Sequence, residues 1–437
     1  MGIEAVFARA PGQAYPTAVR GEGCYLWDAD GRRYLDGASG ALVANIGHGR
    51  AEVARVAAEQ IGRLQYVHGS QFLSEPLVRC AERVVALAPG DPADWVFFPT
   101  SGGSEATESA LKLARQYHVE RGEAGRYRTI SRWTSYHGAS LGALAVSGIH
   151  QRRAIYEPLV NADAFPHIPK PDPSMDGAAD AARLADAIAA LDPATVSAFI
   201  AEPIIGAADA ALAPGPGYYE AIRRICDEAG ALFIADEVMS GIGRAGRSFA
   251  ITYWDAIPDI IIVGKGLAAG YAPLAGILAR RSVHDAIVGG SGAFRHGYTY
   301  AAHPPTLAIG ATVLEIVERE GLIENSAAMG QRLRAGLEQL AERRPQILDV
   351  RGHGLMAGFT LGDPSRGEPW PAPGAATRLG RLAFERGLIV YPGSGAWDGV
   401  RGDHILLGPP LTIQPAELDD LLALLDAALD DLGGEMR

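Results

Sequence analysis

Four short segments of the chain carry residue types that could do chemistry together. The first runs from Thr100 to Ala106 (TSGGSEA), between a predicted strand and a predicted helix. Its glycines let the backbone approach an anion, and a helix N-terminus offers free N–H groups and a positive dipole end. It matches neither a dinucleotide-binding GxGxxG nor a P-loop GxxxxGK, so a nucleotide is not indicated. Taken alone, the segment is more simply a glycine loop in which Ser104 caps a helix.

The other three segments also follow predicted strands. Tyr136-His137-Gly138 provides an aromatic side chain that could stack on a planar ligand. Asp236 ends the apolar segment LFIAD, where a carboxylate needs a hydrogen bond or a charged partner, in a structural or a functional role. Lys265 stands between glycines in IIIVGKG, although lysine is rarely buried without a partner. Burial would lower its pKa and make it a nucleophilic amine.

Together these segments fit one cofactor, pyridoxal phosphate. The serine- and glycine-rich helix start can hold the phosphate, and Lys265 can form an imine with the aldehyde. Asp236 can keep the pyridine nitrogen protonated, which makes the ring an electron sink. Open α/β sheets bind their ligands at the carboxyl ends of the strands, where all four segments fall. No metal is expected, because Cys24, Cys80 and Cys226 lack the spacing of a zinc site.

The elements that must position these residues are strands alternating with helices. Between about Trp95 and Ala279, six β-rich segments alternate with helical patterns; they are VFF, RTISRW, VSAFIAEP, ALFIADEV, IIIVGKG and AGILA. One clear helix begins at Ser104, and another, YYEAIRRICDEAG, ends at Gly230. This alternation predicts a mainly parallel sheet covered by helices on both faces.

The two ends of the chain have a different character. In the first fifty residues, turn signals at Asp30-Gly31 and Asp36-Gly37 predict a small antiparallel ribbon. Residues 52–87 have a helical pattern, as do residues 305–342. Beyond these, short strands, a polar loop and a last helix from Pro415 are typical of a smaller α+β domain.

We therefore predict three parts. Residues 1–55 form an N-terminal segment that packs with the small domain. Residues 56–325 form the large cofactor-binding domain, and residues 326–437 form the small domain.

Composition limits the partners and the location. The 437 residues include 39 Lys and Arg against 51 Asp and Glu, a net charge of −12, which argues against nucleic acid and anionic membranes. The longest apolar stretch, 260–279, holds Lys265, Pro273 and four glycines, so it suits a strand and loop better than a membrane span. The N-terminus carries Glu4 and Arg9 and has no long apolar core, unlike a secretory signal. We expect a cytoplasmic enzyme with small-molecule substrates.

As a set, the motifs resemble those of the class III (ω-) aminotransferases, which are fold-type I pyridoxal-phosphate enzymes. The resemblance runs from about Tyr25 to the last helix, on SGGSEATESALKLAR, YHGAS, AEPIIG, IADEVMSGIGRAG, DIIIVGKGLAAGYAPL, HGYTYAAHP and LLGPPLTI. It implies an α/β fold whose large domain has a mixed, mainly parallel sheet sandwiched by helices. A smaller α+β domain is built from the N- and C-terminal segments. It also implies a homodimer with active sites at the interface, or a tetramer.

The resemblance implies a role for each matched residue. Lys265 would bind the cofactor and carry the proton, and Asp236 would hold the ring nitrogen. Tyr136 would stack on one face of the ring and Val238 on the other. The other cofactor-binding residues that it implies are Gly102, Gly103, Ser104, His137, Glu202 and Thr299, the last reaching the neighbouring subunit. Gly102 departs from the family's usual serine or threonine, which leaves backbone N–H groups to bind phosphate there.

A second departure bears on the substrate. Members that use glutamate tend to have EPxQGE, whose last glutamate pairs with an arginine. This chain has EPIIGA, and without a carboxylate at Ala207 that ion pair cannot form. The segment resembles that of amine:pyruvate and ω-amino-acid:pyruvate aminotransferases.

The carboxylate of pyruvate needs a cation. Arg401 is the first candidate, because arginine offers a bidentate fork, and a plain surface arginine is an equal alternative. His404 and Arg351 are lesser candidates. Trp27 and Phe72 are predicted to line the substrate pocket.

The predicted function is transfer of an amino group from a primary amine or ω-amino acid to pyruvate or another 2-oxo acid. The implied mechanism is ping-pong, through pyridoxamine phosphate. Two alternatives stay open: a 2-oxoglutarate-dependent diamine or amino-acid aminotransferase, and an aminomutase, racemase or decarboxylase on the same scaffold. A non-enzymatic metabolite-binding protein of this fold would hold the cofactor without turnover.

Overall fold

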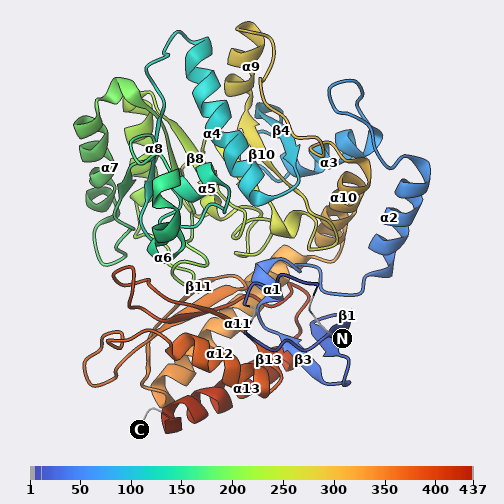
Figure 1. Ribbon diagram of the computed structural model, residues 1–437, viewed down its shortest axis with the longest axis vertical. Coiled ribbons are helices and arrows are strands. Elements are labelled where there is room, and N and C mark those ends of the chain that lie inside the picture. The colour runs from blue at the N-terminus through green and yellow to red at the C-terminus, as the bar shows by residue number, and fades with distance from the viewer. Residues whose placement is uncertain (1–4, 11, 436–437) are drawn as a thin grey trace.

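The computed structural model describes residues 5–10 and 12–435, so Glu4 lies outside the described residues (Figure 1). Its centre is a seven-stranded sheet in the order β4-β10-β9-β8-β7-β5-β6. The strands are β4 (Trp95–Thr100), β10 (Ala275–Arg280), β9 (Ile260–Val263), β8 (Leu232–Asp236), β7 (Val196–Ala201), β5 (Arg128–Arg132) and β6 (His167–Ile168). β10 is antiparallel to both neighbours, and the other pairs are parallel. The expected mixed, mainly parallel sheet is confirmed, with β6 as an addition.

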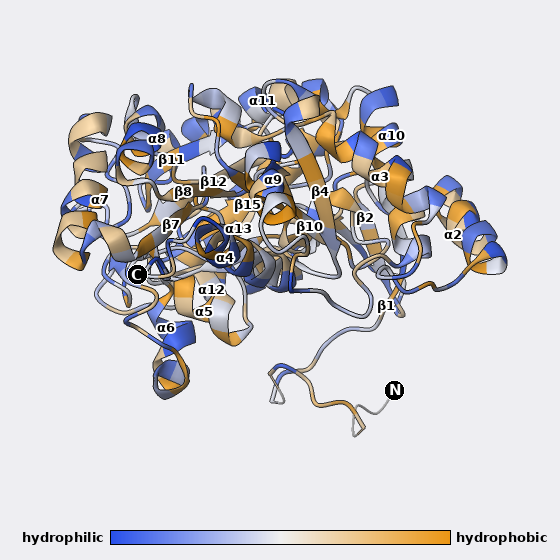
Figure 2. Cartoon of the chain, turned by 90° about the horizontal axis from the view of Figure 1, so that it is seen from above, coloured by the Kyte–Doolittle hydropathy of each residue, from blue (hydrophilic) through white to orange (hydrophobic). Residues whose placement is uncertain are grey.

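Both faces of this sheet are buried because its strands are apolar at successive positions. Phe233 packs with α8 on one face, whereas the next residue, Ile234, packs with α4 on the other. Figure 2 shows the hydrophobic strands β7, β8, β4 and β10 in the middle, with mixed helices around them. The helices of this part are α2 (Ala51–Arg63), α3 (Glu75–Val85), α4 (Gly103–Glu120), α5 (Leu141–Val146), α6 (His150–Arg153), α7 (Gly177–Leu191), α8 (Tyr218–Ala229), α9 (Arg281–Gly289) and α10 (Pro304–Arg319).

The two ends of the chain meet in the lower part of Figure 1. One four-stranded sheet has the order β1-β2-β3-β13, so a C-terminal strand extends the N-terminal ribbon, and the other has the order β11-β12-β15-β14. The strands are β1 (Ala18–Glu22), β2 (Tyr25–Asp28), β3 (Arg33–Asp36), β11 (Ile347–His353), β12 (Met356–Leu361), β13 (Leu388–Ile389), β14 (Tyr391–Gly393) and β15 (His404–Leu407). The helices are α1 (Ser39–Leu42), α11 (Leu322–Arg343), α12 (Ala375–Glu385) and α13 (Pro415–Glu435). The division at residues 55 and 325 stays a prediction.

The structure refines two helical patterns and corrects one turn. Residues 52–87 form two helices, α2 and α3, because Pro76 suits only the first turn of a new helix. Residues 305–342 also form two, α10 and α11, separated at Gly321 with a φ of 60°. Asp36-Gly37 makes no hairpin: the Asp36 carboxylate accepts the Ala38 N–H, and the chain turns into α1.

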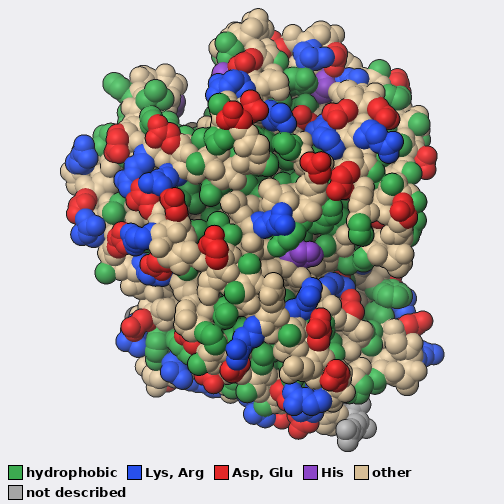
Figure 3. Space-filling view, turned by 180° about the vertical axis from the view of Figure 1, so that it is seen from behind, with side chains coloured by type: hydrophobic (Ala, Val, Ile, Leu, Met, Phe, Trp, Pro, Cys, Tyr) green, Lys and Arg blue, Asp and Glu red, His purple; other side chains and the backbone are tan. Residues whose placement is uncertain are grey.

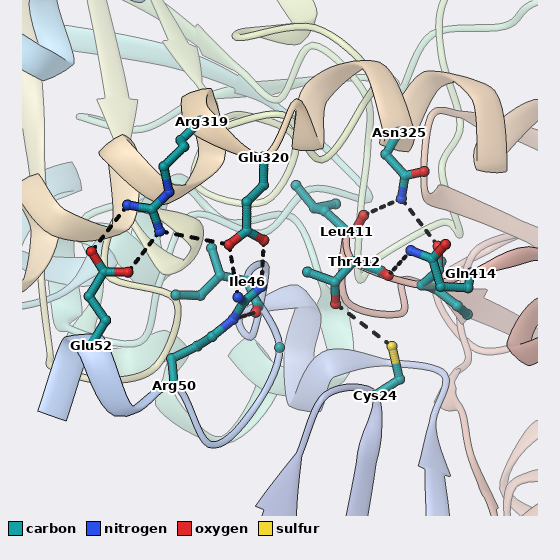
Figure 4. A network of polar contacts seen from close by, with 12 residues as sticks. Cys24, Ile46, Arg50, Glu52, Arg319, Glu320, Asn325, Leu411, Thr412 and Gln414 are labelled. Carbon is teal, nitrogen blue, oxygen red and sulfur yellow. Dashed lines mark hydrogen bonds and ion pairs between the residues drawn. The ribbon is translucent and has the colours of Figure 1, made fainter.

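A polar network joins the N-terminal segment to the junction of α10 and α11 (Figure 4). Arg50 makes two bonds to the Glu320 carboxylate, at 2.9 and 2.8 Å. Arg319 binds Glu52, and Asn325 donates to the Leu411 and Ile413 carbonyls. Segments far apart in the sequence are thereby held together.

Charge is spread over the surface. On the face in Figure 3, basic and acidic side chains are intermixed. Within the described residues, no helix combines the length and the apolar character that a membrane span requires.

We expect Gly330→Ala to lower stability. Gly330 on α11 lies against the β11–β12 turn, where an added methyl would overlap the Gly354 carbonyl. Overpacking of this kind costs about 1–3 kcal/mol, which thermal unfolding will show as a lower Tm. Gly289→Ala on α9 is the matched control, because nothing lies within 4 Å of its added methyl. Equal melting temperatures for the two variants would contradict the close packing of helix and turn.

Candidate active site

A cavity of about 390 Å³ opens where the parallel strands end. Residues that follow β4, β5, β7, β8 and β9 line it, which is where open α/β sheets bind ligands. The predicted residues that line it are Gly102, Gly103, Ser104, Tyr136, His137, Glu202, Asp236, Val238 and Lys265. The structure therefore brings together four segments that are spread over more than 160 positions of sequence, from Gly102 to Lys265.

Lys265 presents an amine without a partner to this cavity. It is separated from β9 by Gly264 and has a φ of 43°, a strained conformation for a residue with a side chain. Its amine has no hydrogen bond or ion pair among the described residues. Burial lowers its pKa to about 8, although the negative charges of Asp236 and Glu202 oppose the shift. The neutral, nucleophilic form of this amine is therefore far more populated near neutral pH than that of an ordinary lysine.

Asp236 is buried and held by two N–H donors. His137 Nδ1 donates to Oδ2 at 2.7 Å, and the Val238 N–H donates to Oδ1 at 3.0 Å. The other ring nitrogen of His137, Nε2, is buried without a partner among the described residues. The carboxylate thus has a fixed orientation in the cavity wall and retains capacity to accept a further bond.

Glu202 positions the aromatic side of the cavity. Its carboxylate accepts the N–H groups of Tyr136 at 2.9 Å and Gly206 at 3.0 Å. Burial raises the pKa of this carboxyl above its ordinary value. Because the bond is to the Tyr136 backbone, it holds the ring's attachment point beside the cavity.

The start of α4 provides the anion-binding end. The helix begins at Gly103, so the expectation that Ser104 caps it is wrong. Instead the Glu105 carboxylate accepts the Ser101 N–H at 2.9 Å, and the Ser104 hydroxyl accepts the Ala139 N–H at 2.9 Å. The first N–H groups of a helix have no partner within it, so those of this turn can bind an anion.

Gly138 lets the Tyr136 loop pass close to this helix start. It has a φ of 138°, and a side chain there would meet the Ser104 hydroxyl at 2.6 Å. Glycine is therefore required for both backbone conformation and space.

Five predicted residues do not line the cavity. Thr299 and Phe72 are exposed, and Thr299 borders a second cavity of about 850 Å³. Trp27 lies on β2 under the Arg20 guanidinium, 3.9 Å from its ring centroid. Ala207 is buried, and its carbonyl accepts from His404 Nε2 at 3.2 Å.

Arg401 is the fifth. Its Nε donates to Asp398 Oδ2 at 2.6 Å, within its own loop. Arg351, the lesser candidate, pairs with Asp209 and Asp349. The substrate-binding roles assigned to these residues remain predictions.

The cavity also has lining residues without a predicted role. Val43 comes from the N-terminal segment, and an ordinary apolar residue gives no sequence signal for such a position. The segment that follows Lys265 belongs to the GLAAGYAPL motif, which by itself assigns none of its residues to the cavity wall. The others are Ser101, Gly138, Gly270, Ala272, Pro273 and Leu274. The apolar residue Met239 also lines the cavity, as expected for a pocket that admits an uncharged amine substituent.

These groups fit pyridoxal phosphate. The helix start suits a phosphate, the unpaired amine of Lys265 suits an aldehyde, and the oriented Asp236 carboxylate suits a ring nitrogen. Across the residues that the structure describes, no three His, Cys, Asp or Glu side chains group as a metal site requires.

Comparison with known proteins identifies the class. The chain belongs to the class-III aminotransferases, whose family model matches residues 6–429. It is similar to YodT, an uncharacterized aminotransferase of Bacillus subtilis, with 40% identity over 421 residues, 94% of each chain. It is also similar to the beta-alanine–pyruvate aminotransferase of Pseudomonas aeruginosa, with 31% identity over 426 residues, 95% of this chain and 92% of that one.

A solved structure of a transaminase has the same fold. An amine transaminase from an uncultivated Pseudomonas species, in its PLP-bound form, superposes with a TM-score of 0.89 and 34% identity, covering 99% of this chain and 98% of that one. The protein is therefore an aminotransferase of the transaminase fold, and the family implies pyridoxal phosphate as cofactor.

The unpaired amine leads to a prediction for the protein freed of cofactor. The chain has three lysines, of which Lys112 is exposed on α4 and Lys170 pairs with Asp209. We expect acetylation of Lys265 to reach half its maximal rate near pH 8, because burial favours the neutral amine. An ordinary lysine reaches it near pH ~10.4. Peptide mapping across a pH series measures this, and a Lys265 midpoint above pH ~10 would show that burial does not depress its pKa.

Proposed function

We propose that this aminotransferase moves an amino group from a primary amine or ω-amino acid to pyruvate or another 2-oxo acid. The observation that carries the proposal is the apolar wall beside the cavity. Ile204 and Ile205 are fully buried, and Gly206 lies directly against Met239, which lines the cavity. This wall has no carboxylate at Ala207, so it holds no ion pair that selects glutamate. The Pseudomonas relative is named a beta-alanine–pyruvate aminotransferase, which supports the same acceptor.

The residues of the cavity would have different roles in the reaction. When bound, pyridoxal phosphate supplies an aldehyde that takes up an amino group and a ring that stabilises carbanion charge. Lys265 would hold the cofactor covalently and, once released, would accept and return the substrate proton at Nζ. Its lowered pKa suits this task near neutral pH. The reaction would run as two half-reactions, with the first product leaving before the second substrate binds.

The remaining residues would position the cofactor. Asp236, oriented by His137, would bind the ring nitrogen. Tyr136 and Val238 would cover the two faces of the ring. The backbone N–H groups at Gly102 and Gly103 and the Ser104 hydroxyl would bind the phosphate. We also propose a cytoplasmic location, which suits the three free, buried cysteines.

We further propose a working homodimer, itself able to pair into a tetramer. Thr299 is outside the cavity of its own chain, which is the position expected if it reaches the partner's phosphate. Apolar side chains are exposed around it, namely Phe72 (62%), Leu73 (77%) and Tyr300 (61%). Large apolar side chains exposed in neighbouring segments are typical of a protein interface.

An acceptor panel tests the reaction. Protein supplied with the cofactor, a primary amine and pyruvate should form alanine, faster than it forms glutamate from 2-oxoglutarate. Lys265→Ala should lower the rate by at least ~10²–10⁴-fold, the usual contribution of a placed base. Chromatography of the amino acid products measures both.

The other outcomes of the panel separate the alternatives. Preference for 2-oxoglutarate would contradict the role given to Ala207 and favour the diamine or amino-acid aminotransferase. Isomerised or decarboxylated substrate without any new amino acid would favour the aminomutase or decarboxylase.

Sedimentation tests the homodimer. Leu73→Glu should shift the protein to the monomer and weaken cofactor binding, because it places a charge in the exposed apolar surface around Thr299. Leu159→Glu is the control, since Leu159 is also exposed (63%) but does not border the second cavity, which Leu73 and Thr299 line. A wild-type protein that sediments as a monomer at micromolar concentration would refute the homodimer.

A further inference from the structure

The proposed function requires a cation for the carboxylate of the 2-oxo acid, and the inference below rests on that function. Arg401 is already engaged, because the Asp398 carboxylate accepts its Nε and also the backbone N–H groups of Val400 and Arg401. These bonds hold the pKa of Asp398 near 2, so the pair stays ionised. To present its whole guanidinium to a substrate carboxylate, Arg401 would have to give up the bond from Nε to Asp398.

A different arginine lies beside the cavity without a carboxylate partner. Arg152 on α6 places its guanidinium carbon 4.7 Å from the centroid of the Tyr136 ring, and Tyr136 lines the cavity. The side chain is half-buried and has no hydrogen bond or ion pair among the described residues. A cation over an aromatic face is held in place, yet all its N–H donors stay available.

The position of Arg152 is set by firm packing of its neighbours on α6. The Trp133 ring lies between those of His150 and His167, with centroid distances of 4.3 Å on each side and interplanar angles of 14° and 19°. Arg153 is buried and donates to the Ala145 and Ser147 carbonyls at 2.7 and 2.8 Å. The short helix is therefore anchored on both sides of Arg152, which makes the guanidinium a preorganised group.

The charge of Arg152 also acts on the reacting amine. Burial is the main cause of the lowered pKa of Lys265, and the positive charges of Arg244 and Arg152 add to it. Arg244 is fully buried and committed to the Leu355 and Pro409 carbonyls and to Asn45. Of these two arginines, Arg152 is therefore the one that remains available to a ligand.

We propose that Arg152, supported by the Tyr136 ring, binds the carboxylate of the 2-oxo acid at the mouth of the cavity. Its planar fork suits a carboxylate, which would displace only water and break no existing ion pair. An amine without a carboxylate would pass the same guanidinium without a loss of bonds. One site could then accept an amine with an uncharged substituent and a 2-oxo acid in turn, without a movement of Arg401.

The test compares the two half-reactions of the holoenzyme, with 1-phenylethylamine as donor and pyruvate as acceptor. Arg152→Gln should raise the KM for pyruvate about 10- to 100-fold, the usual effect of losing a charge-assisted bond, and change kcat little. The rate with the amine alone should stay within about twofold of wild type. Arg152→Lys should recover part of the loss, because it keeps the charge without the fork.

Two controls make the result specific. Arg334→Gln removes a half-exposed arginine of α11 that pairs with Glu338 and lies outside the cavity, and it should leave every parameter unchanged. Arg401→Gln tests the competing residue. If Arg401→Gln raises the pyruvate KM and Arg152→Gln does not, the inference is overturned. It is also overturned if Arg152→Gln slows the amine half-reaction as much as the pyruvate one, since that indicates a structural role.

A binding measurement separates this inference from the proposed function. Propionate has the carboxylate but no reacting oxo group, and its binding to the holoenzyme can be followed by the visible absorbance of the cofactor. Arg152→Gln should weaken propionate binding by a similar 10- to 100-fold. If wild type makes alanine but Arg152→Gln binds propionate as well as wild type does, this inference fails and the proposed function stands. If wild type makes no alanine from pyruvate, the proposed function fails, and propionate binding still reports on Arg152.

Discussion

The desolvated amine of Lys265 is the constraint on which the rest of the site depends. A lysine that faces a protein cavity without a carboxylate partner is costly, and here it also has a strained backbone. The sheet can hold it because the strands on each side, β8 and β10, are almost entirely buried and bonded in register. Asp236 and Glu202 lie near enough to oppose the fall in its pKa, yet neither forms an ion pair with it. The amine stays both neutral enough to react and close to the acids that would orient a cofactor.

The two acids, Asp236 and Glu202, are held in turn by hydrogen bonds to neighbouring groups. His137 and the Val238 backbone orient Asp236, and Glu202 holds the Tyr136 and Gly206 backbones. This chain of bonds links the loops after β5, β7 and β8. The loops keep their relative positions because each ends on a buried polar group that needs its partner. One wall of the cavity is therefore polar and fixed. The wall that contains Met239 is apolar.

The cations differ in whether they are already paired. Arg401, Arg351 and Lys170 each bind a carboxylate, and Arg244 is bound by carbonyls inside the fold. Arg152 is held only by the face of an aromatic ring. An arginine's place in the sequence does not reveal this difference, because the partner that neutralises it comes from the folded surroundings. The identity of a free cation is therefore a tertiary property.

The chemistry of the site and the sheet that carries it could be predicted from the residues alone. Apolar runs at every position of a strand require cover on both faces, so the parallel sheet and the convergence of Lys265, Asp236, Tyr136 and Ser104 at its edge could be predicted. The sequence could not place Val43 or the 270–274 loop in the cavity, nor show that Ser104 lies inside the first turn of α4. It could not separate Arg152 from Arg401 either. Motif residues are recognisable because their chemistry is intrinsic to their type and spacing. Which residues line the cavity, and which charged side chains form ion pairs, depends on contacts between segments far apart in the chain.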